Sequence, residues 1–196
     1  MKLKIRPLKG RWVRLEPLTE DIREEVRQAI DCDPDSWEII SVNGCGDGFD
    51  TWWARAMGEM ERGERIAYAI QRLADKKVVG TSSFLHPRPM DKGIEIGATF
   101  LNPDVRSGPI NPESKLLMLS YAFGQGAIRV ELITDERNAR SQAAIEKLGA
   151  TKEGVLRNHK ITWTGHVRDT VVFSITDADW PGVKQRLDYR LTEDFV

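Results

Sequence analysis

Residues 92–101, KGIEIGATFL, alternate along their whole length with the two-residue period of a β-strand. This period predicts that four apolar residues share one face of the strand: Ile94, Ile96, Ala98 and Phe100. It places the intervening residues on the opposite face: Glu95, Gly97, Thr99 and Leu101. A strand this regular has to lie in a sheet, and its neighbours along the chain decide which kind of sheet it joins.

A helix and a second strand follow this strand. Asn111 can cap a helix with Pro112 in its first turn, and residues 112–123 carry Leu116, Leu119 and Phe123 at helical spacing. Residues 127–134, AIRVELIT, are typical of a strand. A strand, a crossover helix and a strand in one sheet make the two strands parallel. We therefore expect a parallel pair in the sheet.

The segment TDERNARSQAAIEKLGATKEG, which begins at Thr134, predicts a compact helix after the second strand. Asn138 can cap it, Ile145 and Leu148 lie on its apolar stripe, and Gly149 supplies a left-handed stop. Two loops, 102–111 and 134–138, then leave one edge of the sheet, and each runs into a helix N terminus. Free N–H groups and the helix dipole favour an anion there, so a phosphate-bearing ligand is expected.

The remaining elements complete a single domain over residues 1–196. Their ranges are a strand at 11–18, helices at 20–30 (capped by Thr19) and 51–64, hairpin strands at 65–72 and 77–86, a closing hairpin at 154–163 and 166–175, and a terminal helix at about 180–191. The order predicts an α/β fold with a mixed, mostly antiparallel sheet, a central parallel pair and helices on both faces.

The balance of charge argues against a nucleic-acid binder. Lysine and arginine number 29, aspartate and glutamate number 30, and the formal net charge is -1. Nothing approaches the roughly 18 apolar residues of a membrane span, and the N terminus has no apolar run typical of a signal peptide. Cys32 and Cys45 lack metal-ligand spacing. We expect a soluble, cytoplasmic protein without nucleic-acid or membrane partners and without a metal.

The order of elements, together with the blocks TDERNARSQAAIEKLGATKEGVLR and VRDTVVFSITDADWP, resembles the GCN5-related N-acetyltransferases, in particular the branch of ribosomal-protein N-terminal acetyltransferases. The resemblance covers about residues 10–185, and RNARSQAAIEKLGA is its most specific part. It implies that the parallel strands splay and that acetyl-CoA lies in the gap. It also implies that the pantetheine follows the backbone at Thr99, Phe100 and Leu101, and that Asn138 contacts the cofactor.

The pyrophosphate loop departs from the family pattern. That loop commonly reads Q/R-x-x-G-x-G/A, whereas RSGPINPESK has Pro109 and Asn111 where the glycines would fall, and proline offers no N–H donor. A related branch carries a similar version with Gly, Asn, Glu and Lys, which match Gly108, Asn111, Glu113 and Lys115 here. The cofactor-binding residues implied in this loop are Arg106, Ser107, Gly108, Asn111 and Lys115.

Two side chains are candidates for catalysis. Glu95 is placed to accept a proton from the acceptor amine, and the alternative is a surface strand glutamate. Many family members carry a tyrosine a few residues after the asparagine as acid toward the leaving thiolate, where this chain has Ser141 and Gln142. Ser141 is the candidate substitute, and the alternative is a first-turn hydroxyl bonded to backbone. Backbone N–H groups near residues 98–100 are candidates for polarising the thioester carbonyl.

The acceptor side is predicted in residues 28–54, which carry acidic residues and tryptophans but no lysine or arginine. In the family this region borders the acceptor, so Trp37 and Trp53 are candidate acceptor contacts in a rim that attracts a cationic amine. The alternative is a solvated loop whose tryptophans cover the core.

The expected activity is acetyl transfer from acetyl-CoA to a primary amine, either a protein N terminus or a small molecule. One alternative is a non-catalytic acyl-CoA-binding sensor, because the loop is altered and the tyrosine is missing. Another is a nucleotide-dependent oxidoreductase or methyltransferase, suggested by Gly44, Gly46 and Gly48, but this spacing is not G-x-G-x-x-G. A homodimer is left open.

Overall fold

The computed structural model describes residues 1–195 and contains one sheet of eight strands. The strands are β1 (Leu8–Lys9), β2 (Val13–Pro17), β3 (Arg65–Arg72), β4 (Val78–Arg88), β5 (Gly93–Leu101), β6 (Arg129–Asp135), β7 (Thr151–Ile161) and β8 (Val167–Thr176). Their order in the sheet is β1-β2-β3-β4-β5-β6-β8-β7, and only β5 and β6 pair in parallel among the described strands. The predicted fold class is confirmed.

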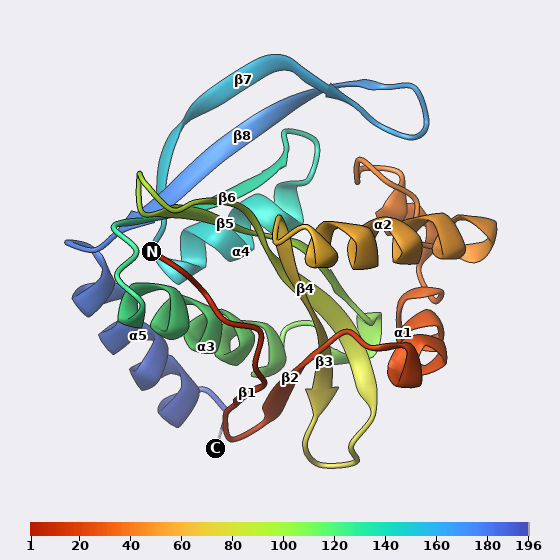
Figure 1. Cartoon of the computed structure of the whole chain (residues 1–196). Coiled ribbons are helices and arrows are strands. Elements are labelled where there is room, and N and C mark those ends of the chain that lie inside the picture. Colours follow the sequence, from red (N-terminus) through yellow and green to blue (C-terminus); the bar gives the residue numbers. More distant parts are fainter. Residues whose placement is uncertain (196) are drawn as a thin grey trace.

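Helices cover both faces of the sheet (Figure 1). They are α1 (Arg23–Ile30), α2 (Phe49–Glu61), α3 (Ile110–Gly124), α4 (Ala139–Leu148) and α5 (Trp180–Glu193). Short 3₁₀ turns lie before or between these helices, at Glu20–Ile22, Pro34–Trp37, Gly46–Gly48 and Pro103–Val105. None of the helices in the described part of the chain has the length and apolar content needed to cross a bilayer.

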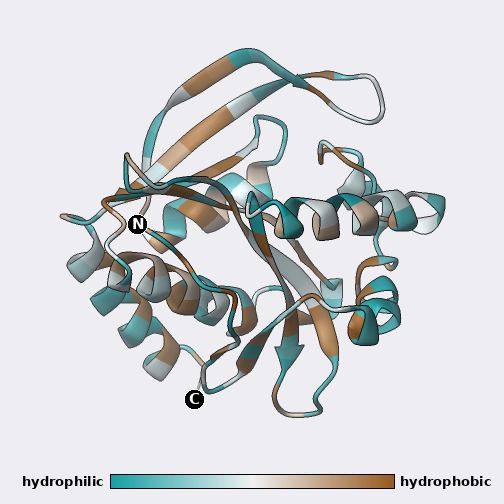
Figure 2. Ribbon diagram, in the orientation of Figure 1, coloured by the Kyte–Doolittle hydropathy of each residue, from teal (hydrophilic) through white to brown (hydrophobic). Residues whose placement is uncertain are grey.

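Two hydrophobic cores lie on opposite faces of the sheet. The first contains residues of α3, α4 and α5 together with Ile94 and Ile96 of β5. The second contains α1 and α2 together with Trp37 and Phe100. Figure 2 shows the central strands with long apolar segments, whereas the helices mix apolar and hydrophilic residues, as expected of elements that bury one side.

A β-bulge in β5 corrects the predicted faces of this strand. Thr81 of β4 pairs with Phe100 and Ser83 pairs with Gly97, so β5 contributes one extra residue between these pairs. Ala98 takes up the extra residue with a left-handed φ of 47°. The bulge reverses the alternation after Gly97, so Phe100 enters the second core instead of joining Ile94 and Ile96 in the first. The prediction that Phe100 shares their face was wrong.

The parallel pair is short, and its strands separate beyond it. β5 and β6 pair only from Gly93 opposite Arg129 to Glu95 opposite Glu131. The C-terminal halves of both strands lie beyond this pairing, and α3 and α4 begin shortly after each strand ends. The splay that the family resemblance implied is therefore present in the strand register.

The helix ends follow the predicted caps in part. Asn138 caps α4 and accepts a hydrogen bond from the Ser141 N–H at 2.9 Å, and Gly149 ends that helix with φ 93°. The prediction for α3 was wrong, because the helix starts at Ile110 and its N-cap is Pro109 rather than Asn111. Thr19 caps only a 3₁₀ turn and makes no side-chain capping bond.

Candidate active site

Glu95 lies in β5 at the last paired position before the splay, and it is 6% exposed. Its Oε2 lies 2.9 Å from Nδ1 of His86 in β4. Gly97, two residues further along β5, leaves room for this carboxylate, because a Cβ built there would lie 2.6 Å from Glu95 Oε1. A buried carboxylate with one oxygen bonded and the other beside a glycine is held in a defined orientation.

His86 is a site residue that the sequence analysis missed. Its backbone has a left-handed φ of 49°, and its side chain is 62% exposed. The hydrogen bond to Glu95 is the main cause that raises the pKa of His86 above its usual value. A register shift between Leu85 and Arg88 opposite β5 brings this imidazole to Glu95, and single-residue shifts of this kind leave little trace in sequence.

Two cations of the β7–β8 hairpin lie close enough to Glu95 to be influenced by its charge. Lys160 of β7 and Arg168 of β8 are cross-strand partners, so their side chains share one face of the hairpin. Burial is the main cause that lowers the pKa of both residues, and Glu95 acts in the opposite direction on each. The hairpin therefore presents positive charge toward the carboxylate.

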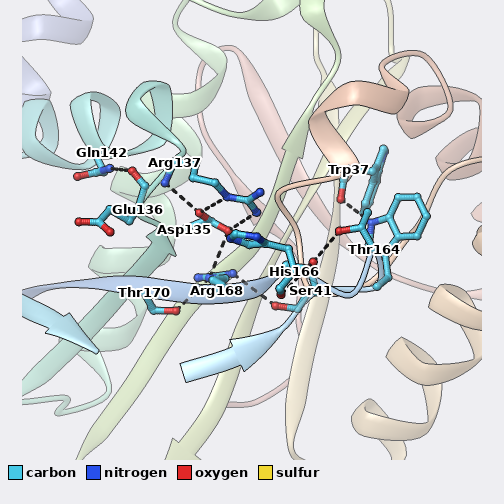
Figure 3. A network of polar contacts seen from close by, with 12 residues as sticks. Trp37, Ser41, Asp135, Glu136, Arg137, Gln142, Thr164, His166, Arg168 and Thr170 are labelled. Carbon is cyan, nitrogen blue, oxygen red and sulfur yellow. Dashed lines mark hydrogen bonds and ion pairs between the residues drawn. The ribbon is translucent and has the colours of Figure 1, made fainter. Parts of the chain in front are cut away.

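Asp135, at the C-terminal end of β6, organises the polar network in Figure 3. It accepts hydrogen bonds from the Arg137 backbone N–H at 2.9 Å and from two nitrogens of the Arg137 side chain at 3.0 and 2.8 Å. Arg168 Nε lies 4.0 Å from the same carboxylate and donates to Thr170 Oγ1 at 3.0 Å. Its Nη1 lies 3.4 Å from Ser41 Oγ.

The β7–β8 hairpin reaches across the molecule to the segment between α1 and α2 (Figure 1). Trp163, in the turn of the hairpin, donates its indole N–H to the carbonyl oxygen of Trp37 at 2.7 Å. With the contact between Arg168 and Ser41, this bond fixes the hairpin at its tip. The hairpin and the segment therefore bound the same side of the splay.

The two tryptophans predicted to contact the acceptor are both packed in the second core. Trp37 stacks on Phe100, with ring centroids 5.0 Å apart, and donates to the Ile30 carbonyl. Trp53 is 2% exposed, and its indole N–H donates to Glu20 at 2.7 Å. The structure gives both a packing role, and contact with an acceptor stays a prediction.

Two acids of the predicted rim form ion pairs with arginines of the same chain. Asp50 forms ion pairs with Arg23 and Arg27. Asp33 pairs with Arg106. These partners lie outside residues 28–54, so arginines from elsewhere in the chain compensate two of the acids in this segment. Asp35, Glu38 and Asp47 form no ion pair within the described residues.

The loop before α3 provides unpaired donors despite its proline. Within the described residues, no protein acceptor is found for the backbone N–H groups of Ser107, Gly108, Ile110 and Asn111. Ser107 has a left-handed φ of 66°, as in loops whose N–H groups converge on an anion. The Oδ1 atom of Asn111 is buried without a hydrogen-bond partner. The loop therefore fits a phosphate-bearing ligand that also offers a donor to Asn111.

Arg106 and Lys115, both predicted to bind the cofactor, are engaged inside the protein. Arg106 donates to the Leu101 carbonyl at 3.0 Å in addition to its pair with Asp33. Lys115 of α3 is buried, and its Nζ donates to Thr99 Oγ1 at 2.6 Å and Ser82 Oγ at 3.0 Å. Burial lowers the pKa of Lys115 to about 7. Lys115 therefore links α3 to the side chains of Thr99 in β5 and Ser82 in β4, and its contact with a cofactor stays a prediction.

Glu113, which belongs to the same helix turn, fastens the N-terminal hairpin to α3. Its carboxylate accepts from the backbone N–H groups of Arg11, Trp12 and Val13 at 2.6 to 2.7 Å. Three N–H donors on one carboxylate satisfy a turn that would otherwise leave them unpaired. Its role is to position the start of α3.

Asn138 and Ser141 lie at the start of α4, at the end of the loop that follows β6. The Asn138 side chain is occupied by capping, through the Ser141 N–H. Within the described residues, the Ser141 hydroxyl has no hydrogen-bond partner, and the residue is half-buried. The alternative reading of Ser141, a first-turn hydroxyl bonded to backbone, does not match the structure, and its role as an acid stays a prediction.

A match to a protein-family model shows which family the chain belongs to. The acetyltransferase (GNAT) domain model matches residues 13–151. The chain belongs to the GNAT acetyltransferases. It is thus an acyltransferase that depends on acetyl-CoA. The comparison with curated proteins finds no match.

Solved GNAT structures resemble the chain over nearly its whole length. A protein from T. thermophilus classed as an acetyltransferase is 36% identical, covers 97% of this chain and 100% of that chain, and has a TM-score of 0.86. A GCN5-related N-acetyltransferase from Brucella melitensis is 27% identical over 99% and 89% of the two chains, with a TM-score of 0.90. Mycobacterium smegmatis RimJ, solved in complex with CoA-disulfide, is 19% identical over 94% and 92%, with a TM-score of 0.77. At that identity the likeness to RimJ shows the fold alone.

Proposed function

We propose that this GNAT protein transfers the acetyl group of acetyl-CoA to a primary amine, with Glu95 as the general base. The observation that carries this proposal is the buried Glu95 carboxylate at the point where β5 leaves β6. Protein N termini and small-molecule amines are both acceptors of the right chemistry. Relatives named for ribosomal proteins are 14% and 17% identical, too distant to choose between these acceptors.

The cofactor path follows from the unpaired donors. The pyrophosphate is proposed to bind the free N–H groups of Ser107, Gly108, Ile110 and Asn111, where the helix dipole of α3 also favours negative charge. The pantetheine is proposed to follow the backbone of residues 99–101, where Lys115 donates a hydrogen bond to the Thr99 hydroxyl. This path leads the thioester along β5 toward Glu95.

The acceptor arrives as an ammonium ion and has to lose a proton before it can attack. Glu95 takes that proton, and the nitrogen lone pair then attacks the thioester carbonyl carbon. A C–N bond forms, a tetrahedral oxyanion collapses, the C–S bond breaks, and coenzyme A leaves as a thiolate. Backbone N–H groups at residues 98–100 are proposed to stabilise the oxyanion. The nitrogen of the tetrahedral intermediate still has a second proton to lose. Ser141 is proposed to take up that proton while its hydroxyl gives its own proton to the thiolate, so the serine ends the step unchanged.

His86 gives Glu95 a route for the proton to solvent. When Glu95 is protonated, its O–H can donate to an unprotonated Nδ1 of His86, which lies 2.9 Å away. The imidazolium then releases the proton from Nε2, because this side chain is 62% exposed. The carboxylate is restored for the next turnover.

The test is release of the coenzyme A thiol from acetyl-CoA in the presence of a panel of amines. Amine-dependent release, with acetyl-CoA raising the melting temperature while NAD, NADP and S-adenosylmethionine do not, is the expected result. Acetyl-CoA binding without thiol release for any amine would replace the transferase with an acyl-CoA sensor. A melting temperature that rises with NAD, NADP or S-adenosylmethionine but not with acetyl-CoA would overturn the assignment of acetyl-CoA as the ligand.

A further inference from the structure

Lys160 and Arg168 form a like-charged pair, and the charge of Glu95 acts on both. They are directly opposite each other in β7 and β8, where like charges repel. Both are partly or fully removed from solvent, and burial lowers the pKa of each. A fold that brings two cations together in this way is stabilised by an anion between them.

Within the described residues, this pair has one ion pair, a long one between Arg168 and Asp135. The Lys160 side chain makes no ion pair or hydrogen bond in the described part of the chain. Arg168 reaches Asp135 only at 4.0 Å, and that carboxylate already accepts three hydrogen bonds from Arg137. Glu95 influences both cations but lies beyond ion-pair distance of each and is bonded to His86 instead.

The hairpin backbone and the Arg168 side chain are held in place without a ligand. The Trp163 indole is bonded to the Trp37 carbonyl, and Arg168 is bonded to Thr170 at 3.0 Å. Because the tip of the hairpin is fixed, little side-chain or loop ordering remains for a bound anion to impose. The position is therefore pre-organised for a carboxylate that enters together with the acceptor.

We propose that the acceptor amine carries a carboxylate, which binds between Lys160 and Arg168 while the amine meets Glu95. This inference rests on the proposed transferase activity and adds the class of acceptor. Amino acids, and peptides whose first residue is acidic, share this chemistry. The carboxylate aligns the amine with the base, and the two cations disfavour an acceptor that carries a second positive charge.

Matched acceptors test the proposal directly. Thiol release is measured with alanine, leucine and phenylalanine against alaninamide, leucinamide and phenylalaninamide, compared at equal concentrations of neutral amine. A second arm compares the dipeptide amides Asp-Ala and Asn-Ala, which differ only in the side-chain carboxylate. In at least one arm, kcat/KM is expected to be about tenfold or more higher for the member with the carboxylate, as for a charge-assisted bond. A preference in the first arm indicates free amino acids as acceptors. A preference in the second arm indicates peptides with an acidic first residue.

Lys160→Met removes one cation and keeps the length of the side chain. It should raise KM for the preferred carboxylate acceptor about tenfold and leave KM for the matched neutral acceptor within about twofold. Lys160→Arg should keep the preference. Lys152→Met, at an exposed position of the same strand, is the control and should change neither KM.

The outcomes separate the two proposals. Thiol release with neutral amines but no preference for a carboxylate in either arm overturns this inference and leaves the transferase in place. Equal losses for both acceptors in Lys160→Met also overturn it, since a general structural defect would act on both. Absence of release with every acceptor contradicts the transferase itself, and the acceptor class falls with it.

Discussion

Nδ1 of His86 lies 2.9 Å from Oε2 of Glu95, so the buried carboxylate at the splay of β5 and β6 is joined to a solvent-exposed imidazole. A buried acid or base in an enzyme has to exchange protons with water between turnovers. If Glu95 is the proposed general base, its proton can reach solvent through this one hydrogen bond to His86. The contact also makes the ionisation of His86 a reporter of the charge on Glu95, because the carboxylate is what raises the imidazole pKa.

Glu95→Gln should lower kcat/KM by about 10²- to 10⁴-fold, because an amide cannot accept the amine proton. The loss should shrink toward high pH, where more of the acceptor is already neutral. A pH profile of thiol release measures both effects. Glu131→Gln, which changes the parallel neighbour of Glu95 in β6, is the matched control and should keep most of the activity. Activity of Glu95→Gln within about twofold of wild type below pH 7 would exclude the general-base role.

Gly97→Ala should displace the Glu95 carboxylate without removing it, because the new Cβ would lie 2.6 Å from Oε1. Displacement of a catalytic group by about 1 Å can cost on the order of 10²-fold in rate. We expect a fall in kcat and a melting-temperature shift with acetyl-CoA that is retained. Gly124→Ala, where an added Cβ meets nothing within 4 Å, serves as the control. Full activity in Gly97→Ala would mean that the carboxylate orientation is unimportant.

His86→Gln should lower the free energy of unfolding, and the loss should be larger at low pH than at high pH. The raised pKa means that the folded state holds the imidazole proton more tightly, so the stabilisation is present below about pH 6.5 and is lost as pH rises through the folded value. Urea midpoints of wild type and variant at pH 5.5 and 8.5 measure this. The opposite sign is expected for His159→Gln, because burial lowers the pKa of His159. An equal difference at both pH values for His86→Gln would argue against the pair.

Lys115→Met should raise the free energy of unfolding, and the gain should be largest at and below neutral pH. The pKa of Lys115 is about 7 in the folded protein and about 10.5 when unfolded, so wild type is destabilised below pH 7 and regains stability as pH rises toward 10.5. The hydroxyls of Ser82 and Thr99 remain bonded to each other at 2.8 Å after the change. Urea midpoints from pH 6 to 10 should therefore converge at high pH. A difference that does not vary with pH would show that the buried ammonium is not the cause.

The order of elements could be predicted because it follows from strong local signals. The alternation in residues 93–101, the cap at Asn138 and the stop at Gly149 are each set by a few neighbouring residues. These signals placed both loops at the same sheet edge. They were enough to predict the parallel pair and the helix N termini.

The site contacts depend on distances across strands, which local patterns do not encode. His86 reaches Glu95 through a register shift, and Phe100 changes face because Ala98 adopts a left-handed φ. Alanine is an ordinary strand residue in a sequence, so nothing marked it as the extra residue of a bulge. The contact between Lys115 and Thr99 could not be predicted either, because a lysine in a helix usually faces solvent.

The extra residue at Ala98 makes β5 behave as two half-strands that face opposite ways. The first half is held through Ile94 and Ile96 by the layer of α3, and the second through Phe100 by the layer of α1 and α2. Deleting a single residue here would swap the inside and the outside of everything downstream in the strand. Insertions and deletions should therefore be tolerated in the loops that flank β5 and rejected within the strand. Inside β5, one residue more or less moves the side chains that follow to the opposite face of the sheet.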